Sequence, residues 1–364
     1  MNLENEPPEA TPKHGGDVYQ LARALGVQVK DLLDFSANIN PLGFPPGLRQ
    51  AALGALEEIC HYPDRRCLEL RRDLAAYHGL DPGQILVGNG STELIYLLAR
   101  ALKPRKGLIV APAFSEYEQA LNAARVPVDF HLTAEADGFT LSNSLAPRGG
   151  DLVFLANPAS PSGVLLPAER LLSVIAALDG AGVRVVLDEA FVDFVEEASL
   201  KAHLGRFPHL ILLRSFTKFF GIPGLRLGYV LAGPKLIERL APVQEPWSVS
   251  TLAQAAGRAC LADRNFMLQT RILVKGEREY LFQRLGALEG LTTFPSAVNY
   301  LLVKLTRPGW SAARLRSDML RRRVIIRDAS NFRGLDERFF RVAVRRRLEN
   351  DRLVAALEQC FKGE

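Results

Sequence analysis

One lysine stands out among the residues that could carry out chemistry. Lys218 lies in the stretch RSFTKFFGIPGLRLG (residues 214–228), between hydroxyl residues and two phenylalanines, directly after the apolar run 209–213. Burial among apolar side chains lowers the pKa of a lysine, and its uncharged amine can then attack a carbonyl and form a Schiff base. The alternative is a surface lysine in a turn after a strand, so the decision depends on residues elsewhere in the chain.

Polar and aromatic residues also follow other short apolar runs. Several such runs alternate with helical patterns, which predicts a mainly parallel sheet that is covered on both faces. Ligands of such sheets bind beyond the carboxyl ends of the strands. An aromatic ring, an amide, a carboxylate and an amine are therefore expected at one edge of the sheet. These residues are Phe114, Asn157, Asp188 and Lys218, and they follow the runs 108–110, 152–155, 183–187 and 210–213.

Together, these residue types are the ones needed to hold pyridoxal 5'-phosphate. A lysine binds the aldehyde as an imine, and a carboxylate pairs with the pyridinium nitrogen so that the ring stays protonated and accepts electrons from Cα. An amide donates a hydrogen bond to the ring oxygen, and an aromatic side chain stacks on the ring. The strand-end residues therefore predict pyridoxal phosphate as the cofactor.

A glycine loop, GNGSTE at residues 88–93, precedes a helical pattern and is a candidate phosphate site. Backbone N–H groups at a helix start bind anions, and glycine lets a ligand approach the backbone closely. The loop lacks the lysine of a nucleotide-binding P-loop, and by itself it could be a turn with a helix cap. The groups that could complete a phosphate site are Ser91, Thr92, Ser215, Thr217 and Arg226.

The composition is that of an ordinary globular protein. Its 364 residues are enough for two domains, and 48% hydrophobic with 23% charged residues argue against wholesale disorder. The formal charge is +5, but acidic residues are interspersed with the basic runs 321–323 and 345–347, which argues against a nucleic-acid surface. Four cysteines without paired spacing favour the cytoplasm, and neither a signal peptide nor a membrane span is expected.

Three parts are predicted along the chain. Residues 1–45 are expected to form an N-terminal arm and substrate-contacting segment, residues 46–253 the large cofactor-binding domain, and residues 254–364 a small C-terminal domain. In the last part, a strand, a helix and two further strands predict an α+β arrangement, at residues 297–303, 311–322, 324–326 and 339–344.

Three motifs carry a family resemblance. They are Asn157-Pro158 with Gly163, the sequence DEAF at residues 188–191, and SFTK at residues 215–218 with Arg226 eight residues later. In this order they resemble the aspartate-aminotransferase superfamily of fold type I pyridoxal enzymes, in the branch that contains histidinol-phosphate aminotransferase. The resemblance implies an α/β fold with a mainly parallel seven-stranded sheet in a large domain and a smaller α+β C-terminal domain.

The resemblance also implies roles for individual residues. Lys218 would be the Schiff-base lysine, Asp188 the partner of the pyridinium nitrogen, and Asn157 the donor to the ring oxygen. Phe114 would stack on the ring, with Tyr117 as the less favoured candidate. The cofactor phosphate would be held by Ser91, Thr92, Ser215, Thr217 and Arg226. Tyr62 would reach the phosphate of the neighbouring subunit's cofactor, so a homodimer is expected.

Four further segments are similar to the L-threonine-O-3-phosphate decarboxylases of cobalamin biosynthesis. They are HGG at residues 14–16, SANINPLG at 36–43, PWSV at 246–249 and IRDASNF at 326–332. This resemblance implies decarboxylation of L-threonine O-3-phosphate to (R)-1-amino-2-propanol O-2-phosphate. It would place six residues around the substrate: His14, Gly15, Asn38, Asn157, Arg327 and Arg341. Arginines suit a ligand that carries both a phosphate and a carboxylate.

Two alternatives remain at this point. A histidinol-phosphate aminotransferase would use the same residues but remove the Cα proton. Phe191 argues against it, because the aminotransferases usually have a tyrosine at that position. The other alternative is a basic binding protein on an enzyme fold that has lost its chemistry, since a fold does not by itself establish an activity.

Overall fold

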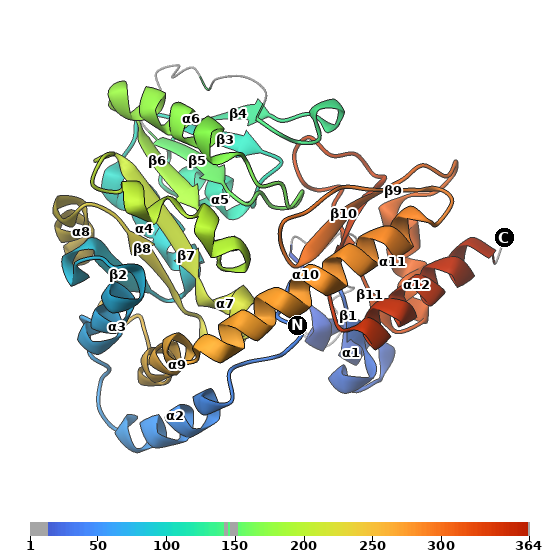
Figure 1. Ribbon diagram of the computed structural model, residues 1–364, viewed down its shortest axis with the longest axis horizontal. Helices are drawn as coiled ribbons and strands as arrows, with labels where there is room; N and C mark the ends of the chain where they lie inside the picture. Colours follow the sequence, from blue (N-terminus) through green and yellow to red (C-terminus); the bar gives the residue numbers. More distant parts are fainter. Residues whose placement is uncertain (1–13, 142–144, 146–151, 363–364) are drawn as a thin grey trace, which may run out of the picture. The chain divides into compact units, whose positions relative to one another are not determined.

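The computed structural model describes residues 14–141, 145 and 152–362 (Figure 1). Contacts between residues divide the chain into two units. The sheet unit comprises Ile39–Ser160 and Val164–Ile272, and the terminal unit comprises Met1–Asn38, Pro161–Gly163 and Leu273–Glu364. This division differs from the predicted boundaries, because residues 39–45 and 254–272 belong to the sheet unit.

The sheet unit is built on seven strands in the order β2-β8-β7-β6-β5-β3-β4. Neighbouring strands from β7 to β4 are parallel, whereas β8 is antiparallel to both β7 and β2. The predicted mainly parallel seven-stranded sheet is therefore confirmed. The strands are β2 (Ile85–Gly88), β3 (Gly107–Ala111), β4 (Val128–Leu132), β5 (Leu152–Ala156), β6 (Arg184–Asp188), β7 (Leu210–Ser215) and β8 (Gly228–Leu231).

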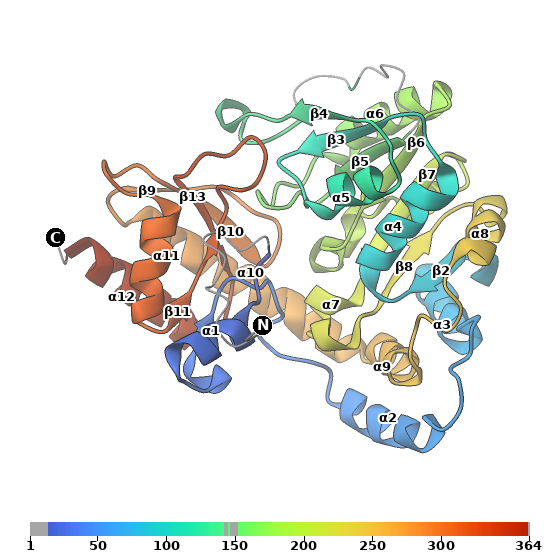
Figure 2. The same cartoon turned by 180° about the vertical axis from the view of Figure 1, so that it is seen from behind.

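Helices cover both faces of this sheet. The helices α4 (Gly90–Leu102) and α5 (Glu116–Ala123) pack on one face, where they share a hydrophobic core with the central strands (Figure 2). The connection from β3 through α5 to β4 runs toward one edge of the sheet, whereas the connection from β5 through α6 (Ala168–Gly180) to β6 runs toward the other edge. Because such crossovers are right-handed, α6 lies on the other face. The other α-helices that lie wholly in this unit, within the described residues, are α2 (Gly47–Ala55), α3 (Leu68–His78), α7 (Phe216–Phe219), α8 (Pro234–Leu240) and α9 (Thr251–Ala262).

The terminal unit contains a four-stranded antiparallel sheet in the order β12-β13-β10-β9. Its strands are β9 (Leu291–Thr293), β10 (Tyr300–Leu305), β12 (Arg327–Asp328) and β13 (Phe339–Ala343). A second, two-stranded parallel sheet pairs β1 (Leu33–Asp34) with β11 (Val324–Ile325). The predicted N-terminal arm therefore contributes a strand to this unit.

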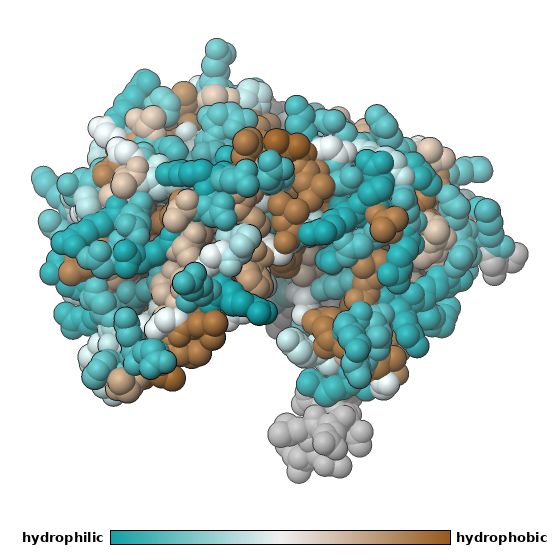
Figure 3. All heavy atoms as spheres, turned by 60° about the horizontal axis from the view of Figure 1, so that its bottom comes forward, coloured by the Kyte–Doolittle hydropathy of each residue, from teal (hydrophilic) through white to brown (hydrophobic). Residues whose placement is uncertain are grey.

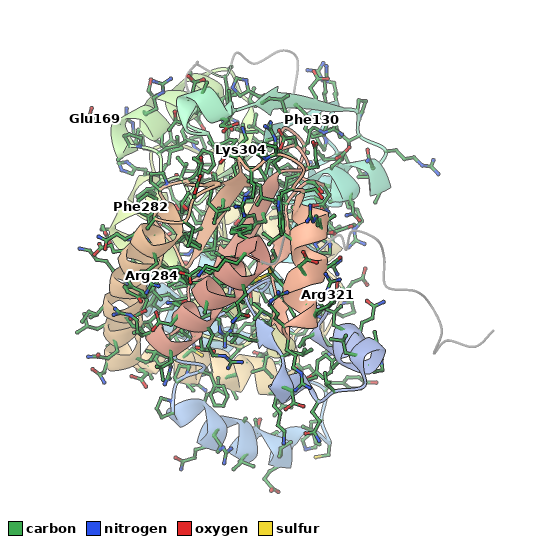
Figure 4. The ribbon with its side chains drawn as sticks, turned by 90° about the vertical axis from the view of Figure 1, so that its right-hand side faces the viewer. Phe130, Glu169, Phe282, Arg284, Lys304 and Arg321 are labelled. Carbon is green, nitrogen blue, oxygen red and sulfur yellow. The ribbon has the colours of Figure 1, made fainter. Side chains whose placement is uncertain are left out.

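Among the described residues, four α-helices belong wholly or partly to the terminal unit. They are α1 (Val18–Leu25), α11 (Ala312–Arg321), α12 (Arg347–Lys362) and the part of α10 (Arg264–Gly286) that follows Ile272. Figure 4 labels Arg284 of α10 and Arg321 of α11. Arg284 forms an ion pair with Asp351, and Arg321 forms one with Asp318. In the part of the chain that the structure describes, no helix is both long and apolar enough to span a bilayer.

Candidate active site

The ends of five strands bring the predicted cofactor residues to one edge of the sheet unit. Asp188 ends β6 and pairs in register with Ala156 of β5, so Asn157 follows directly beside it. The Asn157 N–H donates to the Asp188 carbonyl at 2.9 Å. Because β8 is antiparallel, it begins where β7 and β2 end, and Gly228 lies opposite both Ser215 and Gly88. Residues that are distant in sequence thus meet at the edge where such sheets bind ligands.

The Asp188 carboxylate is buried and held by two donors. The Tyr117 hydroxyl donates to Oδ2 at 2.5 Å, and the Ala190 N–H donates to Oδ1 at 2.8 Å. Burial raises the pKa of Asp188, and the two hydrogen bonds oppose that effect by stabilising the charged form. A buried carboxylate with both oxygens oriented in this way suits the pairing with a protonated ring nitrogen.

The Asn157 amide is also held in one orientation. Its side chain is buried, and Oδ1 accepts a hydrogen bond from the Leu166 N–H at 2.8 Å. This bond fixes which way the amide faces: Oδ1 accepts from the backbone, and Nδ2 is the group that can donate to a ligand. A donor at this place is what the phenolate oxygen of a pyridoxal ring requires.

The start of α4 has the features of a phosphate site. Gly90 has a φ of +79°, and a Cβ added to it would lie 2.6 Å from Arg226 Nη2. A Cβ on Gly228 would lie 2.6 Å from the Ser91 nitrogen. The Arg226 guanidinium and the first strand residue of β8 therefore lie against the helix start, and this close approach requires both glycines. A fixed cation beside a helix N-terminus favours a bound phosphate.

The two hydroxyls before Lys218 lie together at the end of β7. Ser215 Oγ is 2.8 Å from Thr217 Oγ1 and accepts a hydrogen bond from the Thr217 N–H at 3.3 Å. Ser215 is thus the N-cap of the short helix α7, which carries Lys218. The structure places both hydroxyls at the same sheet edge as Asp188 and Asn157.

Asn40 holds the segment that carries Lys218, and it was not among the predicted site residues. Its backbone N–H donates to the Lys218 carbonyl at 3.1 Å. Its side-chain Nδ2 donates to the Phe219 carbonyl at 2.6 Å and to Thr270 Oγ1 at 2.8 Å. These bonds satisfy carbonyls at the end of α7 that have no partner within the helix. The Asn-Pro pair at residues 40–41 indicated a turn in the sequence, but not its partners.

The aromatic residues of α5 and the loop before it occupy different places. Tyr117 is 1% exposed, and its ring stacks on Phe154 with centroids 4.8 Å apart. Phe114 is only half-buried and meets the Tyr117 ring edge to face at 5.9 Å. Because the Tyr117 ring is enclosed in the core, Phe114 remains the candidate for stacking on a cofactor.

Tyr62 lies on the surface of the sheet unit. Its side chain is 80% exposed and stacks on Trp247 with ring centroids 4.7 Å apart. Leu53, Leu56 and Ile59 on the preceding segment are also exposed. Figure 3 shows brown hydrophobic patches among the hydrophilic side chains of the face that it presents.

Two of the predicted substrate residues, Arg327 and Arg341, form an arginine pair in the terminal unit. They lie opposite each other on β12 and β13. Burial lowers the pKa of both guanidinium groups to about 10, and for Arg327 the charge of Arg341 adds to the effect. Two buried like charges side by side are stabilised by a bound anion.

The N-terminal segment lies on the same part of the terminal unit. The Gly16 N–H donates to Ser36 Oγ at 2.9 Å, and a Cβ on Gly15 would lie 2.2 Å from the Ser36 carbonyl oxygen. Arg341 Nη2 donates to that same carbonyl at 3.4 Å. Asn38 is buried, and its carbonyl accepts a hydrogen bond from Asn299 Nδ2 at 2.9 Å. The structure thus brings Gly15 next to Arg341, while the His14 side chain that precedes it is exposed.

A buried ionic cluster lies on the other face of the sheet from Ser215. The Arg214 side chain is inaccessible to solvent, and its nitrogens lie 3.0 Å from Glu189, 3.0 Å from Asp193 and 2.5 Å from Glu196. Because side chains alternate along a strand, Arg214 and Ser215 point to opposite faces. The cluster therefore links β7 to the segment after Asp188 on the face opposite Ser215. Sequence reasoning did not identify it.

Comparison with known proteins places this geometry in a family. The family model for aminotransferase class I and II matches residues 30–357. The chain belongs to this family. Within the family, threonine-phosphate decarboxylase of Salmonella typhimurium is 39% identical over 96% of this chain and 97% of the relative. The resemblance inferred from the motifs is thereby confirmed.

Other members of the family show the same fold and the alternative activity. The solved structure of L-threonine-O-3-phosphate decarboxylase from Porphyromonas gingivalis is 32% identical, with a TM-score of 0.82 over 90% of this chain and 99% of that one. Histidinol-phosphate aminotransferase 2 of Pseudomonas aeruginosa is 35% identical over 94% of this chain and 93% of the relative. Sequence similarity to the decarboxylase of Salmonella is thus greater than to this aminotransferase.

Proposed function

We propose that the protein is a pyridoxal-phosphate-dependent decarboxylase that converts L-threonine O-3-phosphate to (R)-1-amino-2-propanol O-2-phosphate in cobalamin biosynthesis. The observation that carries the proposal is the strand-end cluster of Asn157, Asp188 and the Lys218 segment. The 39% identity to threonine-phosphate decarboxylase supports this choice of reaction.

The residues at the sheet edge fit the cofactor. Asp188 would hold the proton on the ring nitrogen, and Asn157 Nδ2 would donate to the ring oxygen. Phe114 would cover one ring face. The phosphate would be held by the start of α4 and by side chains around it, namely Ser91, Thr92, Ser215, Thr217 and Arg226.

The division of labour in the reaction follows from these positions. When bound, pyridoxal phosphate would supply an electron sink for the bond that breaks at the substrate's Cα. Lys218 would anchor the cofactor through its aldehyde and, once the substrate's amino group has displaced it, would as a free amine deliver a proton to Cα after CO₂ has left. The carboxylate is thereby replaced by a hydrogen, and no oxidant or reductant is needed.

The choice of bond is assigned to residues that bind the substrate away from the reacting atoms. Only the Cα bond that stands perpendicular to the cofactor ring shares its electrons with the ring. Arg327 and Arg341 would bind the phosphate and the carboxylate so that the bond to the carboxylate takes this orientation. His14, Gly15, Asn38 and Asn157 would complete the substrate site.

The exposed Tyr62 is assigned to a neighbouring copy of the chain. A side chain that is 80% exposed and stacked on Trp247 is suited to contact another subunit. In a homodimer it would donate to the phosphate of the partner's cofactor, as the resemblance implies.

The alternative reaction is that of histidinol-phosphate aminotransferase. It shares the fold and the cofactor residues, and sequence identity to the relative compared above is 35%. Phe191 favours the decarboxylase, because a phenylalanine has no hydroxyl to offer to the ring oxygen. The other alternative is a binding protein that has the enzyme fold but catalyses no reaction.

Incubation of the purified protein with L-threonine O-3-phosphate, with CO₂ measured, tests the proposal. We expect stoichiometric CO₂ and aminopropanol phosphate, and no glutamate from histidinol phosphate and 2-oxoglutarate. Glutamate without CO₂ would establish the aminotransferase instead.

Borohydride reduction should attach the cofactor covalently to Lys218, and peptide mass analysis should detect it there. In Lys218→Ala, no cofactor should be attached to the chain. A protein that is colourless before reduction would support the binding protein.

A further inference from the structure

Tyr117 contacts the carboxylate that would face the cofactor, although its ring is part of the core. Its hydroxyl lies 2.5 Å from Asp188 Oδ2, and its side chain is 1% exposed. The ring is held on one side by Phe154, at 4.8 Å and an interplanar angle of 11°. Phe114 meets it edge to face at 5.9 Å and 88°. The hydroxyl is therefore fixed by packing and has little freedom to turn away from Asp188.

Both oxygens of Asp188 have a donor from the protein, and the two donors differ in kind. The Ala190 N–H belongs to the backbone two residues further on, so it accompanies Asp188 in any variant. The Tyr117 hydroxyl comes from another element, α5, 71 residues away in sequence. A carboxylate oxygen has two lone pairs, so each oxygen can accept this bond and still accept one from a ligand.

The energetics of the site give this hydroxyl a function. A buried carboxylate without hydrogen bonds prefers to be neutral, and burial raises the pKa of Asp188. The hydrogen bond from Tyr117 acts in the opposite direction. An Asp188 that has taken up a proton could not stabilise a proton on the ring nitrogen.

We propose that Tyr117 is the positioning residue for Asp188, and that its hydroxyl keeps the carboxylate charged and aimed at the ring nitrogen of the cofactor. This inference rests on the proposed cofactor. Tyr117 does not touch the substrate, and its effect is transmitted through Asp188. A structural role limited to core packing is the competing explanation, because the ring alone also fills space beside Phe154.

The variant that separates these roles is Tyr117→Phe, which keeps the ring and removes only the hydroxyl. The matched control is Tyr96→Phe. Tyr96 also donates to a carboxylate, at 3.0 Å to Glu116, the residue before Tyr117. The control therefore removes the same kind of hydrogen bond, from a tyrosine of α4 to a carboxylate of α5, without touching Asp188.

The test is the binding of two cofactors to the cofactor-free protein and its variants, measured by absorbance and fluorescence titration. One is pyridoxal phosphate, and the other is the analogue in which the ring nitrogen is replaced by C–H. We expect Tyr117→Phe to weaken binding of pyridoxal phosphate by about tenfold, since a hydrogen bond to a buried charge is lost. Binding of the analogue should be the same as in the wild type, because the analogue has no ring nitrogen to pair with Asp188.

Three outcomes would contradict the assignment of Tyr117. Equal losses with both cofactors in Tyr117→Phe would overturn the proposal, because the hydroxyl would then only shape the pocket. No loss with either cofactor would overturn it as well. Tyr96→Phe should bind both cofactors like the wild type, and a nitrogen-dependent loss in this control would also contradict the assignment. Failure of the wild-type protein to bind pyridoxal phosphate would instead refute the proposed function.

Discussion

Arg327 and Arg341 lie opposite each other on neighbouring strands, and burial lowers the pKa of both to about 10. Arg327 Nη2 donates to Asn331 at 2.8 Å, and Arg341 Nη2 donates to the Ser36 carbonyl at 3.4 Å. The two guanidinium groups thus have different partners in the protein. The pair can therefore assign one arginine to the substrate phosphate and the other to its carboxylate.

The product offers a way to tell the two arginines apart, because it keeps the phosphate and lacks the carboxylate. Replacement of the carboxylate-binding arginine by lysine should lower kcat/KM for threonine phosphate by at least about tenfold and leave product inhibition unchanged. Replacement of the phosphate-binding arginine by lysine should weaken the binding of both the substrate and the product. Arg341→Lys is expected to behave in the first way and Arg327→Lys in the second. Steady-state kinetics with added product measures this, and unchanged kinetics in both variants would remove the pair from the substrate site.

At the scale of the element, the start of α4 depends on one glycine. Gly90→Ala would place a Cβ 2.6 Å from Arg226 Nη2 at a φ of +79°. The left-handed backbone costs a non-glycine residue about 1–2 kcal/mol, and the guanidinium must also move. We expect the dissociation constant of pyridoxal phosphate to rise by about tenfold or more.

The control for this variant is Gly180→Ala, at the end of α6. A Cβ there meets no atom within 4 Å, and the backbone needs no positive φ. This variant should bind the cofactor like the wild type. Comparable cofactor affinity in both alanine variants would show that the α4 start is not the phosphate site.

The order of the elements could be predicted because its signals are local. Apolar runs of strand length that alternate with helical patterns are sufficient for a mainly parallel sheet, and that topology brings strand ends together. Asn157 and Asp188 were therefore identifiable as candidates before the structure. The boundary of the units was less accessible, since the pairing of β1 with β11 joins residues almost 300 apart.

The contacts that were missed join residues that are distant in sequence. Asn40 contacts Phe219, 179 residues later, and Tyr117 contacts Asp188, 71 residues later. Neither bond leaves a periodic pattern in the sequence. Arg214 directly follows the predicted strand at residues 210–213, but its three carboxylates come from residues 189–196, a segment without a hydrophobic repeat.

At the scale of the whole molecule, acid should destabilise the protein through His78. Its side chain is fully buried, and Nε2 lies 2.8 Å from the Tyr229 hydroxyl. Burial, aided by the charge of Arg214, lowers the pKa of His78 from 6.5 to about 2. Between these values the unfolded chain binds a proton that the folded chain does not, so the free energy of unfolding falls as the pH falls below 6.5.

The His78→Gln variant should lose this dependence. Its plot of unfolding free energy against pH should be shallower than that of the wild type by up to about 1.4 kcal/mol per pH unit below pH 6.5. Urea unfolding at several pH values measures the two slopes. The exposed His61, changed to Gln, is the control and should keep the wild-type slope. Equal slopes for wild type and His78→Gln would contradict a neutral His78 in the folded state.

The assembly of two chains can be tested by complementation. If Tyr62 serves the partner's cofactor, a mixture of Tyr62→Ala and Lys218→Ala chains contains heterodimers with one intact site. Random assortment would restore about a quarter of the wild-type sites. Asp188→Asn mixed with Lys218→Ala is the control and should recover nothing, because both residues serve the site of their own chain. Absence of recovery in the first mixture would place Tyr62 outside the partner's site.

The fate of the hydrogen on Cα tests the central claim most directly. L-threonine O-3-phosphate that carries deuterium at Cα is incubated with the enzyme in ordinary water, and the product is analysed by mass spectrometry alongside the released CO₂. Decarboxylation breaks only the bond to the carboxylate, so we predict aminopropanol phosphate that keeps its deuterium and one CO₂ for each product molecule. Loss of deuterium to water without release of CO₂ would show that the Cα–H bond breaks instead, and would contradict the proposed decarboxylase.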